Sequence, residues 1–140
     1  MIRKLVPVDG SDQSCRAAAW ADKVAARTGD DLTLLYVFDL NAAEAMALAN
    51  LTREEIAERI AAQAAPSFEK ARAAMRSETE AETLAVIGNP ADEIIGIASA
   101  NSYDHIIMGS RGLSGFQELM LGSVSEKVLR RAHCAVTIVR

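Results

Sequence analysis

Short apolar runs alternate with longer amphipathic segments along the chain, and this alternation restricts the fold more than any other feature. Runs with the length of strands occur at 4–9, 32–37, 80–87, 104–108 and 135–139, with helical patterns between them. Strands joined by helical crossovers favour one parallel sheet with helices on both faces. The 140 residues are enough for one such doubly wound α/β domain and too few for two. We therefore predict a single-domain, Rossmann-like open sheet.

Capping residues mark where the predicted helices begin and end. Ser11 is suited to cap the start of the first helix, and Gly29 to terminate it. Thr52 and Glu55 have the spacing of a capping box at the start of a later helix. Pro66 lies inside that helical pattern, where it predicts a break or kink.

Two further segments have simple local signals. The alanine-rich stretch 39–50 fits either a loop or a short helix. Asn89 and Pro90 indicate the start of another helix, because asparagine favours the cap and proline the first helical position. Ser123 is expected to open the last helix and to form a capping box with Glu126.

The predicted sheet directs attention to two places along the chain. Ligands of open parallel sheets bind beyond the carboxyl ends of the strands, at the point where the strand order reverses. That rule selects the segment 9–11 after the first strand and the segment beginning at Gly109 after the fourth.

A glycine-rich segment follows the fourth strand. Glycines let a chain turn with positive φ or approach a ligand closely, and successive N–H groups can form an anion-binding nest. The helix expected at Ser123 would add its positive N-terminal end, and Arg111 a cation. A capping box needs no ligand, however, and glycine loops alone are weak signals, so both interpretations stay open. The candidate phosphate-binding residues are Gly109, Ser110, Arg111, Gly112, Leu113, Ser114, Gly115, Gly122, Ser123 and Val124.

The spacing Gly109-x2-Gly112-x9-Gly122-Ser123 resembles the nucleotide-binding motif of the universal stress protein family. Segments 6–11, 88–95, 104–112 and 122–129 resemble the same family, so the likeness extends over nearly the whole chain. The resemblance implies a five-stranded parallel sheet of order 3-2-1-4-5. Because the glycine motif is complete, it also implies membership of the ATP-binding subclass, with Mg²⁺ expected on the phosphates.

The resemblance also assigns roles within the site. The triphosphate would lie along Gly109 to Gly115 and at the turn formed by Gly122, Ser123 and Val124. Asp9 would approach the ribose or a metal ion on the phosphates, and backbone near Pro7 and Val37 would frame the adenine. The plain alternatives are a turn-forming role for Asp9 and ordinary core positions for Pro7 and Val37.

The expected function is that of an ATP-dependent regulatory module whose nucleotide state is read by an unidentified partner protein. A slow ATPase or an enzyme that phosphorylates its own serines is the alternative, since Ser110, Ser114, Ser123 and Ser125 supply hydroxyls. A nucleotide-independent interaction module is a third. Walker-type and Gly-x-Ser-x-Gly motifs are absent from the sequence, and Asp9 is the sole acidic candidate at the site.

Charge and composition exclude other classes. A net charge of −4 without a basic face argues against nucleic-acid binding. No apolar run has the length of a membrane span, and the N-terminal residues lack a signal-peptide pattern, so we expect a cytoplasmic location. Cys15 and Cys134 are expected to be buried thiols. His105 and His133 have no partners at the spacing of metal ligands, which argues against a protein-only metal site.

The last apolar run, Ala135 to Val139, lies at a sheet edge in the implied topology. Exposed apolar edges tend to pair with a second chain. Members of the resembled family commonly dimerise through this strand, so a homodimer is expected.

Overall fold

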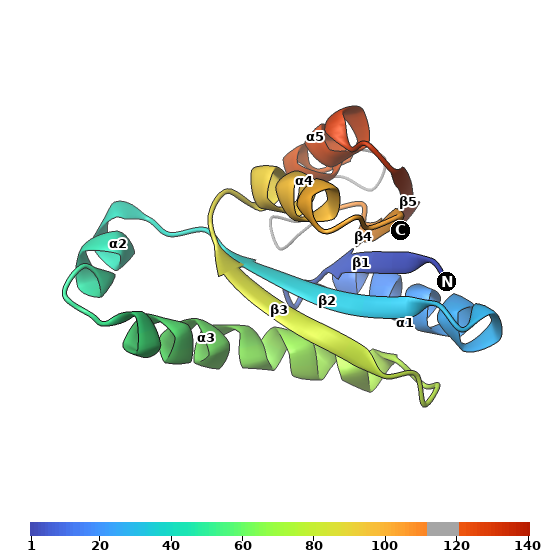
Figure 1. Cartoon of the computed structure of the whole chain (residues 1–140), viewed down its shortest axis with the longest axis horizontal. Helices are drawn as coiled ribbons and strands as arrows, with labels where there is room; N and C mark the ends of the chain where they lie inside the picture. The colour runs from blue at the N-terminus through green and yellow to red at the C-terminus, as the bar shows by residue number, and fades with distance from the viewer. Residues whose placement is uncertain (112–120) are drawn as a thin grey trace.

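The computed structural model describes residues 1–111 and 121–140. Its five strands form one sheet of order β3-β2-β1-β4-β5, and each strand pair is parallel (Figure 1). This confirms the predicted fold class and strand order. The strands are β1 (Arg3–Pro7), β2 (Asp31–Phe38), β3 (Ala81–Ile87), β4 (His105–Gly109) and β5 (Ala135–Val139).

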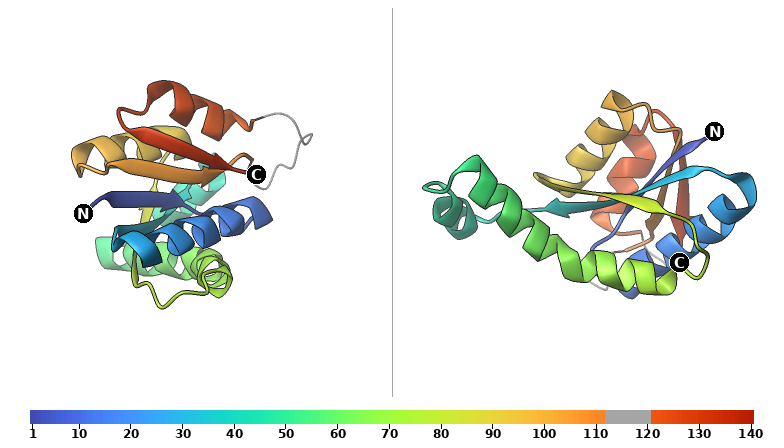
Figure 2. Two further views of the ribbon diagram at one scale, coloured as in Figure 1. Left: turned by 90° about the vertical axis from the view of Figure 1, so that its right-hand side faces the viewer. Right: turned by 60° about the horizontal axis from the view of Figure 1, so that its bottom comes forward.

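Helices cover both faces of the sheet (Figure 2). Helices α1 and α3 pack together on one face, and α4 and α5 pack together on the other. In the described residues the helices are α1 (Asp12–Thr28), α2 (Ala42–Leu48), α3 (Arg53–Ala74), α4 (Pro90–Ala100) and α5 (Ser123–Arg131).

The core consists of two apolar layers separated by the sheet. Val6 and Ile107 belong to the layer beneath α1 and α3, whereas Leu5 and Ile106 belong to the layer beneath α4 and α5. All four are fully buried. Neighbouring residues of a strand point to opposite faces, so continuous apolar runs are what a sheet covered on both sides requires.

The predicted caps of α1 are confirmed. The Ser11 hydroxyl accepts a hydrogen bond from the Ser14 N–H at 3.1 Å. Gly29 ends the helix with a φ of 74°, a left-handed conformation that glycine adopts without steric cost. At α3, Thr52 accepts from the Glu55 N–H at 3.2 Å, but its hydroxyl donates to the Glu55 carboxylate. Only half of the predicted capping box is therefore formed.

Helix α3 continues through Pro66, so the predicted break is wrong. Pro66 is exposed, which leaves the backbone carbonyl freed by its missing N–H within reach of water. Ala64 and Ser67 on either side are buried against the body, and this packing holds the two halves of the helix in one element.

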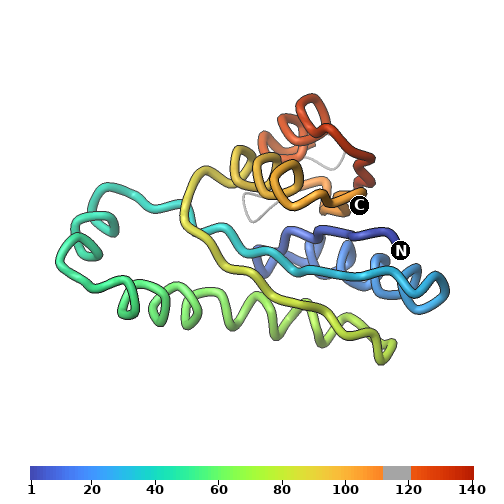
Figure 3. The backbone as a smooth tube through the Cα atoms, in the orientation of Figure 1, coloured from blue at the N-terminus to red at the C-terminus, as the bar shows by residue number. Residues whose placement is uncertain are grey.

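The stretch that fitted either a loop or a helix forms α2. Its cap, Asn41, makes a reciprocal capping box with Glu44. Helix α2 and the first turns of α3 extend beyond the ends of β2 and β3 (Figure 3). Across the described ranges, 1–111 and 121–140, no helix combines the length and apolar character needed to cross a membrane.

Both cysteines are half-buried, so the prediction of buried thiols is wrong. Cys134 lies just before β5, an edge strand with a single neighbour, and the cover there is incomplete. Partial burial still disfavours the thiolate and raises the pKa of Cys15 and of Cys134.

Candidate functional site

A pocket of about 250 Å³ lies at the carboxyl ends of β1 and β4, where the strand order reverses. Strands β1, β2 and β4 and the N-terminal turns of α4 and α5 contribute to its wall. Its lining consists of Pro7, Val8, Asp9, Ser14, Leu35, Val37, Pro90, Ile94, Met108, Gly109, Arg111, Gly122, Ser123, Val124 and Ser125.

The lining combines an apolar wall with a set of polar groups. Leu35, Val37, Ile94 and Met108 belong to the apolar wall, whereas Arg111 and the residues at the start of α5 are polar or offer backbone N–H groups. Such a pocket suits a ligand with a flat apolar part and an anionic part.

Most of the predicted site residues meet in this pocket. Those that line it are Pro7, Asp9, Val37, Gly109, Arg111, Gly122, Ser123 and Val124. Ser110 is buried and does not line the pocket. Gly112, Leu113, Ser114 and Gly115 lie outside the described residues.

Asp9 forms the turn between β1 and α1. Its Oδ1 accepts a hydrogen bond from the Ser11 N–H at 2.9 Å, and its own N–H donates to the Ser14 hydroxyl at 3.3 Å. Gly10, with a φ of 85°, supplies the left-handed step that this turn needs. The carboxylate is thus oriented along the pocket wall with one oxygen already engaged.

The N-terminus of α5 has no side-chain cap, so the predicted capping box of Ser123 with Glu126 is wrong. Gly122 occupies the cap position, which makes Ser123 the first helical residue, and Glu126 pairs with Arg130 at 2.8 Å. The first-turn N–H groups of a helix have no acceptor within it, and their partial positive charge attracts anions. An uncapped helix start in the pocket wall is therefore a candidate anion site.

Gly109 and Gly122 allow neighbouring backbone segments to pack closely, and neither forms a turn with positive φ. Gly122 has a φ of −68°, and Gly109 is not among the glycines with positive φ in the described residues. A Cβ at Gly109 would lie 2.9 Å from the backbone carbon of Gln13, and one at Gly122 would lie 3.3 Å from the Arg111 Cα. The expectation of positive φ does not hold at these two glycines, and the close approach that they allow in the structure is to protein backbone.

The first two N–H groups after β4 are engaged inside the protein. The Ser110 N–H donates to the Val139 carbonyl at 2.9 Å, and the Arg111 N–H donates to the Gln13 Oε1 at 2.6 Å. These two N–H groups are therefore not available as an anion-binding nest. The Arg111 Nε is buried, and in the described part of the chain it has no acceptor. Donors for an anion in this part of the pocket are therefore the start of α5 and the Arg111 guanidinium.

Sequence reasoning did not assign several of the lining residues to the nucleotide site. Leu35 lies beside Pro7 in the register of β1 and β2, so the strand alignment would have found it. Val8 and Met108 are next to predicted residues in the sequence, whereas only the fold brings the residues of α1 and α4 to the pocket. The missed residues are Val8, Ser14, Leu35, Pro90, Ile94 and Met108.

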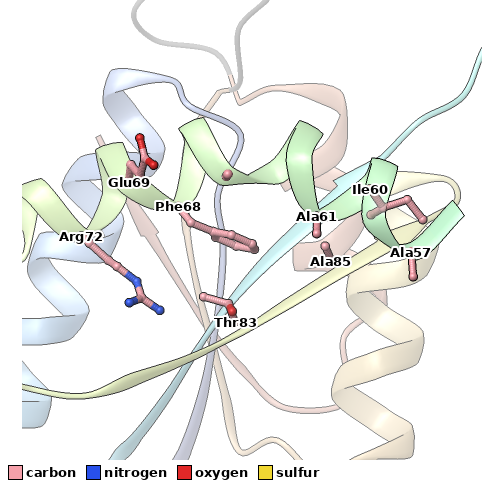
Figure 4. A pocket seen from close by; sticks show the side chains of 9 residues that line it. Ala57, Ile60, Ala61, Phe68, Glu69, Arg72, Thr83 and Ala85 are labelled. Atoms are coloured by element: carbon pink, nitrogen blue, oxygen red, sulfur yellow. The ribbon is translucent and has the colours of Figure 1, made fainter. Parts of the chain in front are cut away.

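A larger hollow of about 570 Å³ lies between α3 and β3 (Figure 4). Its wall is mainly alanine with Ile60 and Phe68, and its charged side chains are Glu69 and Arg72. Arg72 donates to the Ala81 carbonyl at 3.3 Å, which occupies part of its donor capacity. The hollow contains none of the predicted residues and no helix start, so we place the candidate site in the smaller pocket, where polar groups converge.

No protein metal centre is formed by the residues described, 1–111 and 121–140. These residues contain no group of three or more His, Cys, Asp or Glu side chains arranged to hold an ion. His105 instead contacts the Thr137 hydroxyl at 2.7 Å, and burial lowers the pKa of its imidazole.

The sheet order and the position of the pocket define a doubly wound α/β domain with its candidate site at the topological switch point. The model of the universal stress protein family matches residues 1–140, and the chain belongs to this family. It is 34% identical to universal stress protein YxiE of Bacillus subtilis, over 99% of this chain and 98% of that protein.

Solved structures show the same relationship. The structure of hypothetical protein MJ0577, a universal stress protein of Methanocaldococcus jannaschii, matches with a TM-score of 0.79 and 26% identity, over 99% of this chain and 94% of the other. A universal stress protein in complex with cAMP matches with a TM-score of 0.69 and 25% identity, over 99% and 97% of the two chains.

Proposed function

We propose that the chain binds ATP together with Mg²⁺ in the pocket at the carboxyl ends of β1 and β4, and so belongs to the ATP-binding subclass. The observation that carries this proposal is the meeting of an uncapped helix start and the Arg111 side chain with an apolar wall. The cAMP complex of a structural relative supports an adenine nucleotide as the ligand.

The wall suggests how the nucleotide would lie. The adenine would pack on the apolar residues, framed by backbone near Pro7 and Val37. The ribose would approach Asp9, and the phosphates would run toward Arg111 and the start of α5. Mg²⁺ would be held by the phosphates, and Asp9 would be the lining residue whose carboxylate oxygen suits the ion.

The site suits nucleotide-dependent regulation better than hydrolysis of ATP. Asp9 is the carboxylate among the described lining residues, and one of its oxygens accepts the Ser11 N–H. A general base for attack on the γ-phosphate needs a free acceptor aimed at water. We therefore propose a cytoplasmic nucleotide-dependent regulatory module, read by a partner protein, with a slow ATPase or autokinase as the weaker alternative.

Calorimetric titration with Mg²⁺ and ATP tests the proposal. The variants are Gly122→Val at the site and Gly96→Val as a matched control. The side chain at position 122 would press on the Arg111 backbone, whereas a Cβ at Gly96 meets nothing within 4 Å. We expect micromolar binding by the wild type and by Gly96→Val, and a loss of about tenfold or more in Gly122→Val.

Circular dichroism on all three proteins establishes that they remain folded. Absence of ATP binding by the wild type would remove the nucleotide proposal and favour a nucleotide-independent interaction module. Binding that Gly122→Val retains in full would place the phosphates elsewhere.

We also propose that the chain forms a homodimer through β5. The strand lies at the sheet edge, and its residues, Ala135 to Val139, are apolar apart from Thr137. An edge strand presents unpaired backbone groups that a second copy of the same strand can satisfy.

Sedimentation equilibrium of the wild type and of Ile138→Lys tests the dimer. Ile138 packs partly against the core, and the lysine stem can replace that contact while its charge reaches water. We expect a dimer that becomes a monomer in the variant. A dimer of unchanged stability in Ile138→Lys would exclude this interface.

A further inference from the structure

Gln13, in the first turn of α1, contacts the segment that leaves β4. Its Oε1 accepts two hydrogen bonds, from the Arg111 N–H at 2.6 Å and from the Ser110 hydroxyl at 3.1 Å. The side chain is half-buried and joins positions almost one hundred residues apart. The Arg111 N–H fixes the amide orientation, because it can only donate and only the amide oxygen can accept.

The opposite side of the same segment is held by α5. The Ser110 carbonyl accepts from the Gly122 N–H at 2.7 Å and from the Ser125 hydroxyl at 2.6 Å. With its N–H bonded to Val139, Ser110 uses every polar group it has. Arg111 is different, because Gln13 is the acceptor that fixes its backbone N–H.

Gly109 makes this contact possible. A Cβ there would lie 2.9 Å from the Gln13 backbone carbon and 3.0 Å from its Cβ, closer than side chains normally pack. The glycine at the end of β4 therefore lets the first turn of α1 approach until the glutamine reaches Arg111.

We propose that Gln13 is a positioning residue of the nucleotide site, which fixes the Arg111 backbone so that its guanidinium stays at the phosphate end. This inference rests on the proposed function. Glutamine suits the role because its oxygen is a neutral acceptor. A carboxylate could accept the same bonds but would add a negative charge beside the phosphates.

The test compares two ligands and two positions. Gln13→Leu removes the acceptor at nearly constant volume, and Gln63→Leu makes the same exchange on the exposed surface of α3. Affinities for ATP with Mg²⁺ and for adenosine are measured by calorimetry. Amide hydrogen exchange at Arg111 is followed by NMR, with Ser110 as the internal reference.

We expect Gln13→Leu to bind ATP about tenfold more weakly, which corresponds to about 1.4 kcal/mol, and adenosine with unchanged affinity. Exchange should accelerate at Arg111 and not at Ser110, whose N–H keeps the Val139 carbonyl. Gln63→Leu should match the wild type in every measurement. Gln13→Asn, one methylene shorter, should behave as Gln13→Leu and is the substitute if that variant does not fold.

Gln13→Glu separates positioning from charge. The carboxylate should restore slow exchange at Arg111, while ATP affinity stays below that of the wild type. Wild-type ATP binding that Gln13→Leu retains, or equal losses for ATP and adenosine, would overturn the positioning role and leave the proposed function intact. No ATP binding by the wild type would overturn both.

Discussion

Polar groups lie among apolar strands at both the amino and the carboxyl end of the sheet. The two ends differ in whether the protein itself supplies partners for these groups. At the amino end, Lys4 and Asp30 form an ion pair at 2.7 Å with side chains only 3% and 7% exposed. At the carboxyl end, the start of α5 lacks a side-chain cap, and the Arg111 Nε has no acceptor in the described part of the chain.

The Lys4–Asp30 pair belongs to a closed network of hydrogen bonds. Asp30 also accepts from the Thr28 hydroxyl at 2.5 Å and the Ile2 N–H at 3.2 Å. These bonds, with that from Lys4 the strongest, lower the pKa of Asp30 to about 2. Tyr103 donates to the Thr33 hydroxyl at 3.0 Å in the same region.

The difference separates polar groups that stabilise from polar groups that bind. A buried polar group with its partners in place holds the fold, whereas one left open costs stability unless a ligand satisfies it. Substitutions at the amino end should therefore change stability without changing ligand affinity. Substitutions at the carboxyl end, such as those at Gly122 and Gln13, should lower ligand affinity in variants that still fold.

The largest effect on stability is expected for Lys4→Met. The change leaves the Asp30 carboxylate buried without its cation, and breaking such a pair costs about 3 kcal/mol. Urea unfolding should show this loss, while the affinity for ATP with Mg²⁺ stays within about twofold of the wild type.

The double variant Lys4→Met/Asp30→Leu sharpens the comparison. Removing both charges should recover most of the loss, because well-packed apolar residues can replace a buried ion pair. A single variant as stable as the wild type, or one that lost ATP affinity while still folded, would contradict the division between the two ends.

The sequence predicted the elements that depend on local patterns. Strand runs and the Ser11 and Gly29 caps were readable from neighbouring residues. The order of the strands came from the family resemblance, since a run of apolar residues does not specify its neighbour in the sheet.

Features that depend on distant contacts were missed or predicted wrongly. Pro66 does not interrupt α3, because packing of Ala64 and Ser67 outweighs one lost hydrogen bond. Ser123 is not a cap, because the helix begins one residue earlier than the cap pattern implied. The bond from Arg111 to Gln13 spans 98 positions and has no local signal.

The smallest expected effect concerns pH and His105. Burial first, and the nearby Lys4 charge second, lower the pKa of this imidazole in the folded state, although Asp30 acts in the opposite direction. The unfolded chain therefore takes up the proton more readily than the folded one as pH falls below about 6.5. The stabilisation is complete above that pH and is lost as pH falls toward the folded-state pKa.

Asp30 acts in a separate window, since its stabilisation is lost only as pH falls from about 3.8 toward 2. Urea unfolding of the wild type between pH 7.5 and 5 should thus show a decline smaller than the loss from Lys4→Met. His105→Gln removes the titration and keeps a side chain able to hydrogen-bond to Thr137, so its stability should vary less over this range. An identical decline in the variant would assign the titration to another group.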